Sequence, residues 1–206
     1  MPTSGPPPVI KRELDELKVS WSQSSVTCQC GQCTLLNFPW NREALRYWRA
    51  VDELAAANAT KEAPSAPEAK KPPRSKAGVI VTNADESMVL IVQSYENYVG
   101  FPKGSVESSD LTLADAASRE LEEEAGVVVK PQDFDTSKPN INLFETQYFR
   151  LTRNSSEVIR DIKTKAYQDD VSLVGWIRFE CLQDLLQRKV FRANQQCIAV
   201  LRMLGK

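Results

Sequence analysis

The chain has 206 residues and a net charge of −1, with 42% hydrophobic and 26% charged residues. These proportions are those of a globular protein with a core, and they exclude a wholly disordered chain, a collagen-like repeat and a coiled-coil rod. The sequence contains no histidine, which also excludes Ser-His-Asp hydrolysis, Cys-His proteolysis and histidine-based zinc catalysis. The remaining chemistry is that of carboxylates, lysine, cysteine or a metal ion held by carboxylates.

The sequence predicts neither a membrane span nor a secretory signal. No run approaches the roughly 18 apolar residues that cross a bilayer, and residues 1–8 lack the charged and apolar regions of a secretory signal. Five cysteines without an export signal predict reduced thiols. We therefore expect a cytoplasmic protein, with the nucleus as the alternative location, and no membrane partner.

The first 76 residues predict a small, partly helical extension and a linker. A helix is expected from Asn41, a favourable N-cap residue, and its apolar stripe follows helical spacing at Ala44, Tyr47, Trp48, Val51, Leu54 and Ala55. Four prolines in residues 58–76 are typical of a flexible linker. The predicted domains are an accessory module at 1–57, the linker at 58–76 and a catalytic domain at 77–206. The accessory module would bind either a protein partner or RNA.

Beyond residue 76 the sequence mixes strand and helix patterns without strict β-α-β alternation, which predicts an α/β fold with a mixed sheet. The predicted strands are 77–82, 88–93, 127–129, 143–151 and 171–178, and the predicted helices are 113–125, 179–186 and 192–204. Thr112 and Asp115 resemble a capping box at the start of the first of these helices, and Gly126 is a natural stop at its end.

A cluster of glutamates in the helix at 113–125 predicts a metal site. Glu120, Glu123 and Glu124 share one helix face, with Cβ atoms about 5–6 Å apart. Their like charges repel one another unless a cation lies among them, and Mg²⁺ and Mn²⁺ prefer such oxygen ligands. Arg119 is adjacent and has the geometry to orient a carboxylate.

Residues 104–127 resemble the Nudix box, G-x5-E-x7-R-E-U-x-E-E-x-G-U, in which U is aliphatic. Residues 119–127, R-E-L-E-E-E-A-G-V, fit every fixed position of its second half, and Gly104 stands upstream. One extra residue separates Gly104 from Arg119, and the early glutamate is either replaced by Asp110 or displaced by the insertion.

The resemblance to Nudix hydrolases implies an α/β/α sandwich around a mixed sheet, and hydrolysis of a diphosphate linked to another group. It also implies that Glu120, Glu123 and Glu124 hold Mg²⁺ or Mn²⁺, with the Gly104 carbonyl as a further ligand. The base that activates water would be Glu123, Glu124 or a carboxylate outside the box. None of the three glutamates in the second half of the box is lost, which disfavours the third interpretation, a Nudix-fold binding protein without turnover.

The flanking sequence is similar to that of the catalytic subunits of eukaryotic mRNA decapping enzymes. The similar segments are V-L-I-V-Q-S-Y at 89–95 and G-F-P-K-G at 100–104, although Val99 stands where that family has tryptophan. This resemblance implies that Lys103 contacts substrate phosphate. It also implies a catalytic carboxylate six residues before Trp176, at Asp170, with Asp169 as a second candidate.

Charge is distributed unevenly, at −9 over residues 77–184 and +5 over residues 185–206. We therefore expect Arg188, Lys189 and Arg192, at the start of a basic final helix, to bind RNA phosphates. Tyr95, Tyr98 and Phe101 are candidate rings for stacking on a base or cap, with Tyr95 favoured, and the alternative is that they are core residues. The favoured function is hydrolysis of the 5′ cap of RNA. The alternative is hydrolysis of dinucleoside polyphosphates or diphosphoinositol polyphosphates.

Cys28, Cys30 and Cys33 place three thiols within six residues and are candidate ligands for Zn²⁺. Zinc takes four nitrogen or sulfur ligands in structural sites, and the chain has no histidine to complete the set. The fourth ligand would be Cys181, Cys197, a carboxylate, water or a residue of a second chain. The alternative is three thiols that bind nothing.

Overall fold

The computed structural model describes residues 24–28, 30–38, 75–93, 98–165 and 171–206. The predicted helix from Asn41, the candidate base-binding residue Tyr95 and the candidate carboxylates Asp169 and Asp170 therefore lie outside the described residues. None of the described helices is long and apolar enough to cross a membrane.

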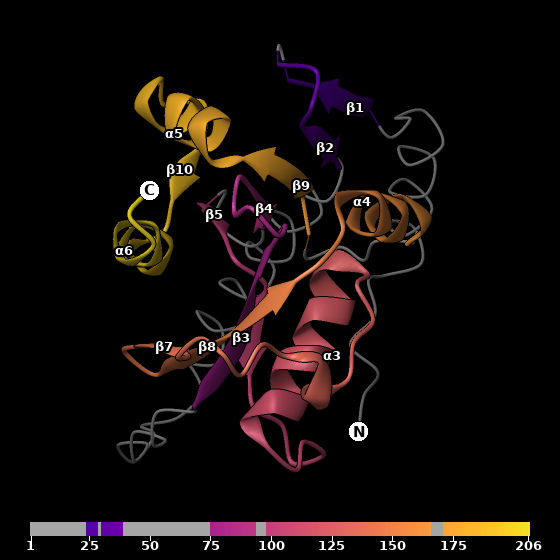
Figure 1. Ribbon diagram of the computed structural model, residues 1–206, viewed down its shortest axis with the longest axis vertical. Coiled ribbons are helices and arrows are strands. Elements are labelled where there is room, and N and C mark those ends of the chain that lie inside the picture. Colours follow the sequence, from indigo (N-terminus) through magenta and orange to yellow (C-terminus); the bar gives the residue numbers. More distant parts are fainter. Residues whose placement is uncertain (1–23, 29, 39–74, 94–97, 166–170) are drawn as a thin grey trace, which may run out of the picture.

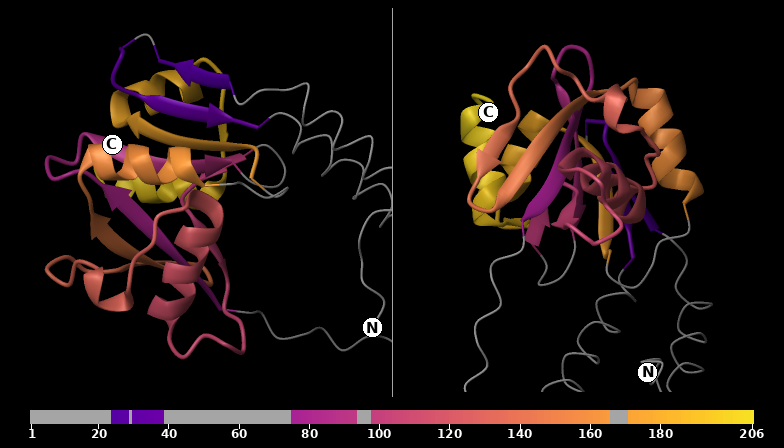
Figure 2. Two further views of the ribbon diagram at one scale, coloured as in Figure 1. Left: turned by 90° about the vertical axis from the view of Figure 1, so that its right-hand side faces the viewer. Right: turned by 90° about the horizontal axis from the view of Figure 1, so that it is seen from below.

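Among the described residues, ten strands form one mixed sheet, shown in Figures 1 and 2. The strands are β1 (Ser24–Thr27), β2 (Thr34–Asn37), β3 (Lys76–Thr82), β4 (Met88–Gln93), β5 (Tyr98–Gly100), β6 (Lys103–Ser105), β7 (Ile141–Leu143), β8 (Thr146–Thr152), β9 (Leu173–Arg178) and β10 (Arg192–Ala193). Their order is β1-β2-β9-β4-β3-β8-β7, while β5 pairs with β4 and β10, and β6 pairs with β3. The pairs β3–β8 and β5–β10 are parallel and the others are antiparallel.

Helices cover both faces of this sheet, as Figure 1 shows. They are α3 (Leu113–Ala125), the 3-10 helix η2 (Pro131–Asp133), α4 (Ser155–Thr164), α5 (Phe179–Gln187) and α6 (Gln195–Met203). The residues of β4 are buried throughout and alternate between two cores. Met88, Leu90 and Val92 pack in the core under α3 and α4, whereas Val89 and Ile91 pack in the core under α5 and α6. This arrangement confirms the predicted α/β/α sandwich with a mixed sheet.

The β1–β2 hairpin belongs to the same sheet, because β2 pairs with β9 in antiparallel register from Thr34↔Trp176 to Asn37↔Leu173. Leu35 faces the α5/α6 core, and Leu36 and Phe38 face the α3/α4 core. The prediction had placed these residues in a separate module, because a strand of four residues shows no measurable period. The boundaries at residues 57 and 76 stay a prediction, as does a protein partner for residues 1–57.

Several predicted elements are confirmed with small shifts, and others are wrong. The predicted helix at 113–125 is α3 with the same bounds, and the predicted strands at 77–82, 88–93 and 171–178 correspond to β3, β4 and β9. Residues 127–129 form no strand, because Val127 is buried against α3 and α4 without pairing with a neighbour strand. The predicted strand at 143–151 is interrupted after β7 and resumes as β8, and α4 was not predicted.

Candidate active site

Local signals set both ends of α3. The Thr112 hydroxyl accepts a hydrogen bond from the backbone N–H of Asp115 at 3.1 Å. Gly126 ends the helix with a φ of 74° and donates its N–H to the carbonyl of Glu122, a left-handed conformation that favours glycine. The apolar face between these ends packs on the sheet and consists of Ala116, Ala117, Leu121 and Ala125. The position of the helix therefore fixes where its glutamates lie.

Strand β6 brings the backbone of Lys103 and Gly104 against two of these glutamates. The N–H of Lys103 donates to Glu124 Oε2 at 2.8 Å. A Cβ atom at Gly104 would lie only 2.0 Å from Glu120 Oε1, so the carboxylate fills the space that any other side chain would need. Glu120 and Glu124 are each only 9% exposed. The structure thus brings together the predicted residues Gly104, Glu120 and Glu124.

Arg119 links the glutamates to the loop before the helix. Its Nη1 donates to Glu120 at 2.9 Å and to Glu123 at 3.1 Å. Its Nη2 donates to the Ser105 carbonyl and to Asp110, both at 2.9 Å, and its Nε donates to Asp110 at 3.2 Å. Asp110 therefore occupies the position of the early glutamate of the box and pairs with Arg119. The one-residue insertion lies between Asp110 and Arg119.

Burial and neighbouring charges perturb the titration of the site. Burial raises the pKa of Glu120, and the charges of Glu123 and Glu107 raise it further, while Arg119 opposes this shift. Burial lowers the pKa of Lys103, and nearby Glu124 opposes that shift. Crowded, partly buried carboxylates are a donor set that suits a hard divalent cation such as Mg²⁺ or Mn²⁺. The residues present therefore fit the metal that Nudix enzymes typically use.

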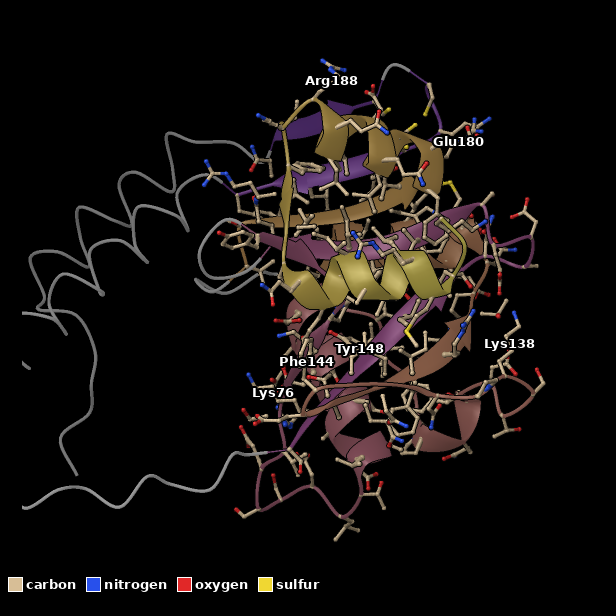
Figure 3. All side chains as sticks on the ribbon, turned by 90° about the vertical axis from the view of Figure 1, so that its left-hand side faces the viewer. Lys76, Lys138, Phe144, Tyr148, Glu180 and Arg188 are labelled. Atoms are coloured by element: carbon tan, nitrogen blue, oxygen red, sulfur yellow. The ribbon has the colours of Figure 1, made fainter. Side chains whose placement is uncertain are left out.

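The predicted RNA-binding residues lie in the connection between α5 and α6, not in the final helix. Arg188 is the C-cap of α5 and forms an ion pair with Asp184 at 3.0 Å; Figure 3 shows it at the outer end of α5. Lys189 follows with a φ of 59° and Arg192 lies in β10. The helix starts later than predicted because the side chain of Asn194 caps it, and Arg202 is the only charged residue of α6.

Two of these basic residues line a pocket of about 450 Å³ with apolar and aromatic neighbours. Its lining residues are Tyr98, Leu186, Lys189, Phe191, Arg192, Ala193 and Ile198. Tyr98 is 37% exposed and pairs with Arg192 across β5 and β10. Phe101, the other aromatic of this segment, is a core residue in edge contact with Tyr148. Sequence order gave no signal that Tyr98 would meet Lys189, Phe191 and Arg192.

The cysteines gather on the α5 face of the sheet. The Sγ atoms of Cys28, Cys30, Cys33 and Cys181 all lie within 4.8 Å of one another, so these residues could hold a metal ion. Cys197 is instead fully buried among the apolar residues of the α5/α6 core. Cys181 is therefore the candidate that the fold brings to the three clustered thiols.

Comparison with known proteins identifies the family of this chain. Residues 72–196 match the family model of the NUDIX domain. The chain belongs to the NUDIX domain family. Over 110 residues it is 34% identical to a protein of Invertebrate iridescent virus 3 whose name describes it as a hydrolase, 111R. That alignment covers 53% of this chain and 62% of the viral protein, so the chain spans less than two thirds of its length.

Solved structures of NUDIX proteins resemble the chain at low identity. The NUDIX hydrolase from Alicyclobacillus acidocaldarius has a TM-score of 0.48 and 16% identity, and the match covers 65% of this chain and 91% of that one. The NUDIX domain of Shewanella oneidensis NrtR, complexed with ADP ribose, has a TM-score of 0.46 and 19% identity, with 71% and 96% covered. At these identities the likeness concerns the fold alone.

Proposed function

We propose that the protein is a metal-dependent hydrolase that cleaves a diphosphate bond in a nucleotide-like substrate. The observation that carries the proposal is the convergence of Glu120, Glu123 and Glu124 with Arg119 against β6. Membership of the NUDIX family supports it. The cysteine cluster is a separate site, because its thiols come from the β1–β2 hairpin and α5, whereas the glutamates come from α3.

The residues of the site have distinct roles in this proposal. Glu120, Glu123, Glu124 and the Gly104 carbonyl would hold Mg²⁺ or Mn²⁺, which supplies charge neutralisation of the diphosphate and activation of water when bound. Arg119 orients Glu120 and Glu123, and the Lys103 N–H orients Glu124. The Lys103 ammonium binds a substrate phosphate oxygen.

The proton of the attacking water would pass to a carboxylate at the site. Glu123 is the most open of the three glutamates, with 57% of its side chain exposed, so water and substrate reach it freely. Glu124 is held in place by β6 and remains a candidate base, as does Asp170, outside the described residues. A base must lie within hydrogen-bonding reach of the water that it activates.

The 5′ cap of RNA is the substrate that we propose first. Lys189 and Arg192 place two positive charges in one pocket with the Tyr98 ring, which suits phosphates flanked by a stacked base. Strand β5, which carries Tyr98, is separated from Lys103 by only Phe101 and Pro102. The pocket is thus linked through a short segment to the phosphate-binding lysine.

A compact substrate is the second candidate, namely a dinucleoside polyphosphate or a diphosphoinositol polyphosphate. Arg188 is occupied by Asp184, and α6 carries a single arginine, so the basic surface is smaller than a long RNA tract would use. A pocket of about 450 Å³ also lies in the range of sites for small ligands, roughly 300–1,000 Å³.

The reaction class is tested with Glu124→Gln and a matched change, Glu122→Gln, in the full chain. Glu122 is exposed and lies on the other side of α3 from Glu120, Glu123 and Glu124. With Mg²⁺ present, Glu124→Gln is expected to lower turnover by about 10²-fold or more, and Glu122→Gln to leave it unchanged. Equal activity of the two variants, or full activity in EDTA, would contradict the proposal.

The substrate is identified by comparing capped RNA of a few tens of nucleotides, free cap analogue, diadenosine tetraphosphate and diphosphoinositol polyphosphates. If RNA phosphates contact Lys189 and Arg192, Lys189→Glu with Arg192→Glu should remove any preference for long capped RNA and reduce the salt dependence of binding, by roughly 0.7 in slope per contact. Arg160→Glu with Lys163→Glu, both on α4, is the charge-matched control and should leave that preference unchanged. Equal activity on free cap analogue and capped RNA, unaffected by charge reversal, would favour the compact substrates.

A further inference from the structure

We propose that Cys28, Cys30, Cys33 and Cys181 bind one structural Zn²⁺ that fixes the β1–β2 hairpin to the start of α5. This site is independent of the proposed hydrolysis, because it shares no residue with the carboxylate site, which is formed by α3 and β6. Figure 3 shows sulfur atoms near Glu180, where the turn between β1 and β2 passes the start of α5.

The sulfur positions are close to those of a zinc tetrathiolate. A tetrahedral site with Zn–S bonds of about 2.3 Å places its sulfurs about 3.8 Å apart. Here the four Sγ atoms all lie within 4.8 Å of one another, and Cys30 Sγ is 3.5 Å from Cys33 Sγ. All five cysteines of the chain are free thiols. Small side-chain rotations would therefore complete the coordination.

The backbone is arranged to bring these thiols together. Gly31 has a φ of 70°, a left-handed conformation that favours glycine, and its N–H donates to the Cys28 carbonyl at 2.9 Å. The resulting tight turn directs the thiols of Cys28, Cys30 and Cys33 to one place. Cys181 joins them from the first turn of α5.

Two backbone amides already donate to these sulfurs. The Gln32 N–H lies 3.4 Å from Cys30 Sγ, and the Arg178 N–H lies 3.3 Å from Cys33 Sγ. Donors of this kind orient metal ligands and tune their charge. Arg178 and Cys33 are 145 positions apart in the sequence, so the second contact arises from the pairing of β2 with β9.

The ligand set selects zinc and a structural role. Among the described residues, the cluster contains four thiols and no carboxylate, whereas Mg²⁺ and Mn²⁺ prefer oxygen ligands. Four thiolates leave no open position for water or substrate, which distinguishes a structural zinc site from a catalytic one. Cys30 is exposed and Cys33 is buried, so an ion reaches the site from the solvent side.

The hairpin is a short addition at one end of the strand order. Its two strands are four residues each, and only β2 pairs with the rest of the sheet, through β9. Binding of zinc to a site that forms only in the folded state adds its binding free energy to folding. Zinc would therefore hold β2 on β9 and keep Leu35, Leu36 and Phe38 in the two cores.

The test measures the metal content of the purified full chain and of two matched variants, Cys181→Ala and Cys197→Ala. We expect about one zinc per chain in the wild type and in Cys197→Ala, and near zero in Cys181→Ala. Replacement by Co²⁺ should give the visible spectrum of tetrahedral sulfur coordination in the wild type and in Cys197→Ala, but not in Cys181→Ala. Removal of zinc should lower the melting temperature, and added Mg²⁺ should not restore it.

Four results would overturn the proposal. The first is folded wild-type protein that contains no zinc and gives no such cobalt spectrum. The second is a Cys181→Ala variant that keeps full zinc content and the all-sulfur spectrum, and the third is iron in place of zinc. The fourth is a count of three free thiols after denaturation without reductant, where five are expected, since this would indicate a disulfide such as Cys30–Cys33.

Discussion

Replacement of Phe38 by alanine tests whether the hairpin is part of the NUDIX core. Phe38 lies outside the residues that match the family, 72–196, yet it is only 1% exposed and belongs to the α3/α4 core with Trp176 and Ile162. Its N–H donates to the Ser172 carbonyl at 2.8 Å, and alanine preserves that bond. The substitution therefore removes the ring and little else.

The expected cost follows from complete burial. Truncation of a buried phenylalanine to alanine costs about 3–5 kcal/mol through lost transfer free energy and the cavity left behind. Since 1 kcal/mol shifts the melting temperature of a chain this size by roughly 2–4 °C, the Phe38→Ala variant should melt roughly 6–20 °C below the wild type. This is a large part of the typical folding free energy of about 5–15 kcal/mol.

The assay is thermal and urea unfolding of the full chain in saturating zinc, with Phe144→Ala as the matched control. Phe144 is 78% exposed, so its truncation should change stability by no more than about 0.5 kcal/mol. If the melting temperature of Phe38→Ala equalled those of Phe144→Ala and the wild type, residues 24–38 would not contribute to the core. That result would refute the reasoning from burial.

Two further predictions concern the active site and acid stability. The Cβ atom of Gly104→Ala would overlap the Glu120 carboxylate, so this variant should keep the wild-type melting temperature but lose metal-dependent activity on the order of 10²-fold. The control, Ser105→Ala, keeps its backbone carbonyl and should remain active. Normal kinetics for Gly104→Ala would contradict the fit of Glu120 against β6. The hydrogen bond from Lys138, with Arg150 nearby, lowers the pKa of Glu86 from 4.5, so its contribution to stability is present above about pH 4.5 and is lost as pH falls through the folded-state pKa. Glu86→Gln should therefore be less stable than the wild type in urea unfolding at pH 7 and approach it on acidification, and a constant difference across that pH range would show that the pair does not titrate as inferred.

The sequence by itself determined the elements whose signals are local. The spacing of Glu120, Glu123 and Glu124 defines one helix face, and Thr112 and Gly126 mark the ends of that helix, because capping and 3.6-residue periodicity depend only on nearby residues. The same holds for β3, β4 and β9, whose apolar runs are long enough to be recognised. Local signals failed at residues 127–129, a β-branched run in which Val127 is buried but Val128 is exposed, and which pairs with no strand among the described residues.

Only the tertiary structure decided which distant residues meet. Asp110 reaches Arg119 across a loop, and Gly104 leaves room for Glu120 only because β6 lies against α3. Cys181 joins the thiols of the hairpin because β2 pairs with β9, the strand that leads directly into α5. Strand register and helix packing depend on which core each side chain fills. The contacts in each core join residues far apart in the sequence, so they form only when the whole chain folds.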